Sequence, residues 1–129
     1  MDLDKVKYWE ELSDYDMETA EAMFQTKRWL YVGFMCHQTI EKIFKAYWCS
    51  KIEGTSPMSH NLINIAQSCG LNSIMSEEQK LFISAIMPLN IESRYPSYKH
   101  SISDALSEDR CKELIENTKL LQAWIKERL

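Results

Sequence analysis

Apolar residues recur with the period of an α-helix in four long stretches of this chain. These stretches are residues 4–25, 29–49, 76–92 and 107–128. Residues 60–69 show the same period over a shorter length, and residues 71–75 are expected to be a linker. No stretch of useful length alternates apolar and polar side chains as a half-buried strand does. The pattern therefore predicts four long helices and one short helix.

Residues that start or bend helices support this division of the chain. Ser76 and Gln79 have the spacing of a capping box at the start of the stretch from residue 76 to residue 92. Ser59 can cap the short helix, which makes His60 a capping-region residue in its first turn. Pro88 should kink the helix that contains it, because proline has no N–H to donate to the preceding turn.

Few residues in this chain favour turns. The 129 residues include three glycines and three prolines, and 45% of them are apolar. This length is typical of one domain, and short connections between long helices favour antiparallel packing. The predicted fold is therefore all-α: an antiparallel four-helix bundle with one additional short helix, in a single domain over residues 1–129.

The helix predicted for residues 29–49 is apolar around more than half of its circumference. Such a helix lies at the centre of a bundle or has a partner chain on its second face. His37 and Glu41 lie on the apolar side, one turn apart, and could hydrogen-bond to each other, although a histidine there is more often an ordinary core residue. Lys42 and Lys45 face the other way and are expected to be solvated.

Asp16 lies in the middle of the apolar side of the first predicted helix. A carboxylate that faces a core needs a partner, because burying an unpaired charge is unfavourable. Two interpretations follow. Asp16 lies at the solvated edge of the apolar side, or it anchors a buried Arg or His.

The net charge and the cysteines of the chain exclude some classes of protein. The net charge of −4 excludes a protein that coats nucleic acid through a generally basic surface. The four cysteines form no paired ligand motif, so we expect buried free thiols in a reducing cytoplasm, with no metal site and no cofactor. The longest uncharged run, residues 29–40, is too short to span a membrane, and no signal-peptide pattern is present.

The stretch from residue 94 to residue 100 carries the densest set of chemically active side chains. The set is Arg94, Tyr95, Tyr98, Lys99 and His100. The arginine can bind phosphate oxygens through a fixed fork of donors, and the histidine can transfer a proton near neutral pH. A helix end followed by a turn could bring both groups to one phosphate. The alternative is a polar loop that closes a helical hairpin.

Three segments together resemble the HEPN domain family. Residues His37–Ala46 are similar to the signature of the family's second helix, and Ser59–Leu62 is similar to the His-polar-Leu start of its next helix. Ser93–Pro96 resembles the family's Arg-Tyr-Pro segment at the end of the fourth helix. The order and spacing of the three segments also match, so the resemblance covers nearly the whole chain.

The resemblance implies a helical bundle that usually forms a homodimer. Many members are metal-independent endoribonucleases with an Arg followed a few residues later by a His, a pattern that Arg94 and His100 fit. In such members the sites of two subunits meet in one cleft. Members are often paired with a minimal nucleotidyltransferase as toxin and antitoxin. Others bind nucleotides or act as adaptors without known chemistry.

The sequence departs from the nuclease members around this pair. Tyr95 stands where many of them have a small polar residue, and Pro96 interrupts the segment that leads to His100. Toxins paired with a nucleotidyltransferase can carry a tyrosine just after the histidine that receives AMP, whereas this chain has Ile102 there and its nearest tyrosine, Tyr98, precedes His100.

Three hypotheses on function remain at this point. In the first, Arg94 and His100 cleave RNA in a dimer, with Tyr95, Tyr98 and Lys99 as binding residues. In the second, the same segment binds a nucleotide, or the second helix docks a nucleotidyltransferase, without catalysis. In the third, the segment has only a structural role, and the arginine pairs with a carboxylate of the supporting polar residues, which we predict to be Asp16, His37 and Glu41.

Overall fold

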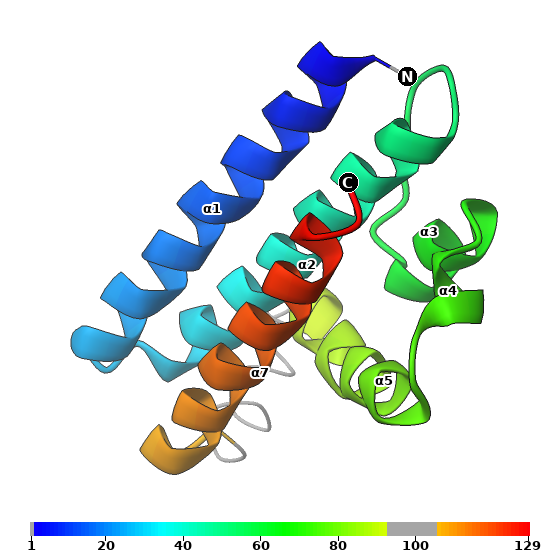
Figure 1. Ribbon diagram of the computed structural model, residues 1–129. Coiled ribbons are helices and arrows are strands. Elements are labelled where there is room, and N and C mark those ends of the chain that lie inside the picture. The colour runs from blue at the N-terminus through cyan, green and yellow to red at the C-terminus, as the bar shows by residue number, and fades with distance from the viewer. Residues whose placement is uncertain (1, 93–105) are drawn as a thin grey trace.

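The computed structural model describes residues 2–92 and 106–129 (Figure 1). Within these residues it contains six helices and no strand. The helices are α1 (Leu3–Gln25), α2 (Trp29–Lys51), α3 (Leu62–Ser68), α4 (Leu71–Ile74), α5 (Glu77–Glu92) and α7 (Glu108–Lys126). The predicted all-α fold class is therefore confirmed, and the structure has two short helices, α3 and α4, where the sequence predicted one.

Helix α2 lies at the centre of this arrangement. It packs against α1, α3, α5 and α7, and α4 packs on α3. Figure 1 shows α1 running antiparallel to α2, with α7 beside them and the end of α5 directed at the middle of α2. Helix α2 is therefore the central helix of the bundle. Helices α1, α3, α5 and α7 all pack against it.

Side-chain caps fix the starts of α1 and α5, whereas α2 begins without one. The Asp2 carboxylate accepts hydrogen bonds from the backbone N–H groups of Asp4 and Lys5 at the start of α1. Ser76 and Gln79 form a reciprocal pair before α5. The Ser76 N–H donates to Gln79 Oε1 over 2.9 Å, and the Gln79 N–H donates to Ser76 Oγ over 3.1 Å. The predicted capping box is therefore confirmed.

Helix α3 starts two residues later than the sequence pattern indicated. Its cap is Asn61, whose Oδ1 accepts the N–H of Asn64 over 3.1 Å. Ser59 instead accepts the N–H of Asn61 over 3.0 Å, so it shapes the approach to the helix. His60 consequently lies before the helix and not in its first turn, which frees its side chain for the contact described below.

One further boundary differs from prediction, and another agrees with it. The expected linker at residues 71–75 contains the short helix α4, which is preceded by Gly70 in the left-handed region at φ 79°. Four residues are too few to show a helical period, so sequence pattern could not detect this helix. Helix α5 continues through Pro88 to Glu92, as expected for a helix that resumes beyond the proline.

The core is built on both sides of α2. Ile40, Ile43 and Phe44 of this helix are fully buried. They belong to one apolar cluster that includes Met17 of α1 and Ile125 of α7. Burial of such side chains stabilises the fold by about 1.5–3 kcal/mol each relative to exposure. The wide apolar arc predicted for α2 thus corresponds to a central helix.

Gly33 allows Leu89 and Leu106 to approach α2 closely. A Cβ atom at this position would lie 3.1 Å from Leu89 Cδ1 and 3.2 Å from Leu106 Cδ1. These distances are shorter than ordinary carbon contacts. Leu89 belongs to α5, and Leu106 is buried just before α7. Both leucines therefore pack on the same turn of α2.

No helix within residues 2–92 and 106–129 is both long enough and apolar enough to cross a bilayer.

Candidate functional site

The residues predicted to act on a ligand lie outside the described part of the chain. They are Arg94, Tyr95, Tyr98, Lys99 and His100. Their roles, and the roles discussed for Pro96 and Ile102, therefore stay predictions. The structure does describe the predicted supporting residues, which are Asp16, His37 and Glu41. They belong to two polar groups between α2 and its neighbouring elements.

A buried carboxylate is the centre of the first group. Glu41 is only 2% exposed, and its two oxygens accept from His60 Nδ1 at 3.0 and 3.1 Å. Lys45 Nζ lies 3.3 Å from Glu41 Oε2, and His37 Nδ1 lies 3.9 Å from Glu41 Oε1. We call these four residues, Glu41, Lys45, His60 and His37, the Glu41 cluster.

Local structure explains how the cluster is assembled. His37, Glu41 and Lys45 follow one another at intervals of four residues, which places them on one face of α2. His60 reaches the same carboxylate from the segment before α3. The Lys45 ammonium also lies 5.1 Å from the centre of the Trp9 ring of α1. Three elements therefore converge on one buried ion pair.

The protonation pattern of His60 follows from its partner. An ionised carboxylate can only accept hydrogen bonds, so His60 Nδ1 must carry the proton that it donates to Glu41. In the neutral ring, Nε2 is then an unprotonated nitrogen with a free lone pair. The His60 side chain is 52% exposed, so the carboxylate is buried while the ring that it orients reaches solvent.

The hydrogen bond considered possible between His37 and Glu41 does not form. The 3.9 Å separation is too long for a hydrogen bond and is within ion-pair range only. His60 takes the position nearest to the carboxylate instead. The default interpretation of His37 as a core residue agrees with its complete burial. The sequence analysis did not predict that His60 contacts Glu41. The one indication that His60 matters was its place in the segment Ser59–Leu62, which resembles the family.

The second group forms a polar line from α1 to α5. Lys42 Nζ lies 3.1 Å from Asp16 Oδ2 and 3.1 Å from Gln38 Oε1. Gln38 Nε2 then donates to Asn90 Oδ1 over 3.0 Å. We call Asp16, Lys42, Gln38 and Asn90 the Lys42 line. It connects the middle of α1 to the last turn of α5, immediately before the segment that contains Arg94.

The Lys42 line bears on two predictions. Asp16 is partly exposed and pairs with Lys42, a partner that neither interpretation of Asp16 had named. Lys42 and Lys45, expected to be solvated, both form ion pairs, and Lys45 is buried. The Asp16–Lys42 pair could not be read from the periodic pattern, because it depends on how α1 lies on α2. The Glu41–Lys45 pair has the four-residue spacing that the sequence does show, and it was overlooked.

The cysteine thiols are free, and their environment keeps them protonated. Cys36, Cys49 and Cys111 are buried, and Cys69 is half-buried. Burial raises the pKa of Cys36 to about 12, and the nearby Thr118 hydroxyl offsets this only in part. Burial raises the pKa of Cys111 to about 11, partly offset by Arg110. Among the residues that the structure describes, no group of three His, Cys, Asp or Glu side chains is placed to hold a metal ion.

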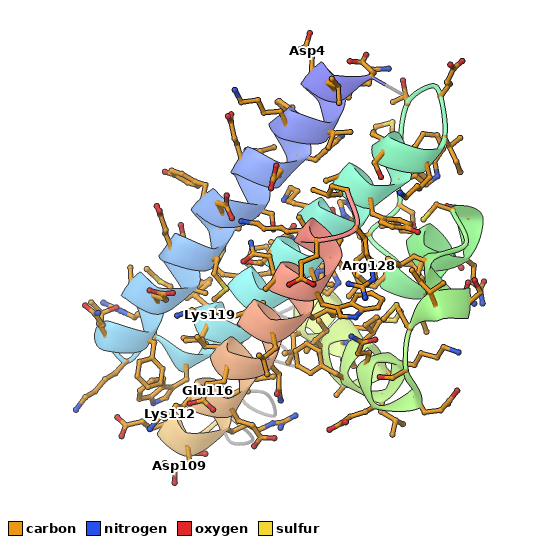
Figure 2. All side chains as sticks on the ribbon, viewed as in Figure 1. Asp4, Asp109, Lys112, Glu116, Lys119 and Arg128 are labelled. Carbon is orange, nitrogen blue, oxygen red and sulfur yellow. The ribbon has the colours of Figure 1, made fainter. Side chains whose placement is uncertain are left out.

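The outer face of α7 mixes charges of both signs. Figure 2 shows Lys112, Glu116 and Lys119 along this helix, and Lys119 Nζ lies 2.6 Å from Glu21 Oε1 of α1. Such pairs neutralise one another, so this face does not form a basic stripe of the kind that follows a phosphate backbone.

Comparisons with known proteins agree with the resemblance seen in the sequence. The crystal structure of TT1696 from Thermus thermophilus is similar, with a TM-score of 0.82 and 14% sequence identity. The match covers 97% of this chain and 98% of TT1696, so the two proteins share a fold over their full extent. No curated protein matches the sequence. The HEPN domain family matches residues 6–129. This chain therefore belongs to the HEPN domain family.

Proposed function

We propose that this HEPN-domain protein is a metal-independent endoribonuclease, with Arg94 and His100 as its catalytic pair. The observation that carries the proposal is the presence of this pair, at the spacing seen in nuclease members, in a chain that matches the family over residues 6–129. The Lys42 line supports it from the described part of the chain. Through Asn90, it ties the last turn of α5 to α2 directly before the segment that contains both groups.

The chemistry requires only positioned side chains. His100 takes the proton of a ribose 2′-hydroxyl or protonates the leaving 5′-oxygen, and Arg94 stabilises the charged phosphorane through its fixed donors. Lys99 contacts a flanking phosphate, and Tyr95 and Tyr98 stack on bases. The products are a 2′,3′-cyclic phosphate and a free 5′-hydroxyl.

A homodimer completes the proposed site. One histidine per subunit can serve only one of the two proton transfers at a time, whereas two subunits that share a cleft supply an acid and a base. As in other family members, a minimal nucleotidyltransferase is the proposed partner, with this chain as the toxin of the pair. Sedimentation velocity of the purified chain tests the dimer.

The ribonuclease activity is tested with purified protein, a fluorescent single-stranded RNA and excess chelator. We expect cleavage that leaves a cyclic phosphate, which mass spectrometry of the fragments identifies. Arg94→Ala and His100→Ala should each lower the rate by about 10²–10⁴-fold. Lys112→Ala, on the mixed-charge face of α7, is the control and should cleave at the wild-type rate. Cleavage that persists unchanged in both catalytic variants would contradict the assignment.

The second candidate function is a non-catalytic nucleotide-binding or adaptor module. The net charge of −4 and the mixed charges along α7 favour it, because a long RNA would meet little positive surface there. Calorimetry with ATP and GMP distinguishes the two functions. Binding that is lost in Arg94→Ala, together with no RNA cleavage by the wild-type chain, would support this candidate over the ribonuclease.

A further inference from the structure

The outer side of α1 carries tyrosines and carboxylates in a regular row. Exposed side chains recur there at alternating steps of four and three residues, and we call them the α1 seam: Asp4, Tyr8, Glu11, Tyr15 and Glu18. These are the steps by which one helix packs along another in a coiled coil. From Asp4 to Glu18 the helix rises by about 21 Å. The spacing is therefore that of a surface that binds a helix.

The bundle leaves the α1 seam uncovered. Helix α1 packs against α2 and α7, and Figure 1 shows both of them on one side of it. Tyr8 and Tyr15 are 57% and 68% exposed. The Tyr8 ring lies edge-on against Trp9, with the ring centres 5.1 Å apart. Exposed tyrosines are common anchors of protein interfaces, because burying a ring that is already oriented gains apolar contact at little cost in conformational freedom.

Negative charge is concentrated on the same segment. Residues 2–25 contain eight acidic and two basic side chains, a net charge of −6, whereas the whole chain has a net charge of −4. The remaining residues therefore carry a net charge of +2. The two signs of charge are thus segregated along the chain, and a partner attracted to α1 must be basic.

Lysines of α2 and α7 neutralise carboxylates at the flanks of α1. Three such pairs are described: Lys42 with Asp16, Lys119 with Glu21 and Lys126 with Asp14. On the seam, Glu11 lies 3.9 Å from Lys7 of the same helix, and this contact between exposed side chains contributes little. The described residues provide no lysine or arginine partner for Glu18. The seam therefore keeps carboxylates available to the basic side chains of a partner.

We propose that the α1 seam docks a basic amphipathic helix of another protein. Apolar side chains of that helix pack between the rings of Tyr8 and Tyr15, and its lysines or arginines face Glu11 and Glu18. A second copy of this chain does not suit the seam, because two segments of net charge −6 repel each other. RNA is repelled for the same reason. The inference does not rest on the proposed ribonuclease function, and the proposed homodimer would use another face.

The test measures the fluorescence anisotropy of a labelled synthetic helix with the full chain. The peptide repeats every seven residues, with Leu where it faces the tyrosines, Lys where it faces the carboxylates, and Ala and Gln elsewhere. A control peptide has the same composition in shuffled order. We expect the patterned peptide to bind about tenfold or more tightly than the shuffled one. Its affinity should fall as salt rises, because salt screens contacts between exposed charges.

Two double variants separate the aromatic contribution from the electrostatic one. Tyr8→Ala/Tyr15→Ala should weaken binding of the patterned peptide about tenfold or more. Glu11→Gln/Glu18→Gln keeps the shape of both side chains, and it should weaken binding at low salt and reduce its salt dependence. Because all four residues are exposed, both variants should melt near the wild-type temperature by circular dichroism.

Matched controls carry comparable changes on other helices. Leu81→Ala/Leu120→Ala removes two apolar side chains of α5 and α7 that are 71% and 70% exposed. Glu77→Gln/Glu113→Gln removes two exposed carboxylates from the same two helices. Both controls should bind the patterned peptide as the wild type does.

The outcomes that contradict the proposal are distinct. Equal binding of the patterned and shuffled peptides, or no binding of either, would overturn it. Wild-type affinity in both seam variants, or an equal loss in the controls, would place the peptide elsewhere on the surface. A homodimer that dissociates in Tyr8→Ala/Tyr15→Ala, measured by sedimentation velocity, would assign the seam to a second copy and would also reject the proposal.

Discussion

Single buried residues set how this protein responds to pH. The Cys36 thiol is completely buried, and burial raises its pKa to about 12 from an ordinary value of 9.0. The folded chain therefore binds the Cys36 proton more tightly than the unfolded chain does. Linkage then requires that stability is retained below pH 9 and is lost as the pH rises toward 12.

We expect the free energy of unfolding to fall more steeply above pH 9 in the wild type than in Cys36→Ala. Between pH 9 and pH 11 the unfolded thiol has lost its proton and the folded one has not, which contributes about 1.4 kcal/mol per pH unit. Urea unfolding at several pH values measures the two slopes. The cavity in Cys36→Ala can lower its stability equally at every pH, so only the slopes are compared. Parallel plots of unfolding free energy against pH for the two proteins would contradict this prediction.

At the scale of the element, α2 carries both the core and the buried charges. Its apolar residues pack against the neighbouring helices. Its other faces carry the α2 residues of the Glu41 cluster and of the Lys42 line. Each buried ion of this helix is paired, so removing one ion of a pair leaves the other uncompensated.

We predict that Glu41→Leu destabilises the fold by roughly 3–5 kcal/mol, because the buried Lys45 ammonium loses its carboxylate. The double variant Glu41→Leu/Lys45→Met should recover most of that loss, since both charges are then absent. Urea midpoints measure the effect. Glu11→Leu, which removes an exposed partner of Lys7, is the control and should leave the midpoint unchanged. A double variant less stable than Glu41→Leu would refute the argument.

Local signals in the sequence predicted the elements well, because capping and periodicity are local physical effects. The Ser76–Gln79 box and the start of α2 at Trp29 were predicted correctly. The start of α3 was not, because Asn61 competes with Ser59 as a cap and its carboxamide captures the N–H of Asn64. Sequence patterns show which residues can cap a helix but not which one does.

The polar groups were harder to predict than the helices, for a physical reason. Asp16 and Lys42 are far apart in sequence, so their pairing depends on how α1 lies on α2. The same holds for His60, which reaches Glu41 only after the chain turns back before α3. Glu41 itself was predicted as a supporting residue because it lies one helical turn from His37 on the apolar side of its helix. The Arg94–His100 pair lies outside the described residues and stays a prediction.

At the scale of the whole molecule, buried hydrogen bonds join the three longest helices. Ser13 Oγ of α1 donates to the Thr39 carbonyl of α2 over 2.8 Å. Gln122 of α7 donates through Nε2 to Ser13 Oγ over 2.9 Å and to Asp14 Oδ1 over 3.2 Å. Lys126 forms an ion pair with the same Asp14. Helices α1, α2 and α7 should therefore unfold as one unit.

We expect the backbone amides of α2 to exchange with deuterium most slowly, at the rate set by global unfolding. Helix α2 is enclosed by four other helices, whereas α3 is seven residues long and exposes Ile63. The amides of α3 should therefore exchange through smaller openings, and their exchange rates should depend less on the urea concentration. Mass spectrometry of exchange at low urea concentrations measures both. Equal urea dependence in α2 and α3 would show a single cooperative unit that includes α3.

The contact of Leu89 and Leu106 with Gly33 has a consequence for how this protein can diversify. Both leucines are held by one turn of α2, and they flank residues 93–105. A side chain at position 33 would meet both leucines at once, at 3.1 and 3.2 Å from its Cβ atom. Substitution of this one glycine would therefore disturb α5 and the residue before α7 together, so we expect this position to tolerate little variation.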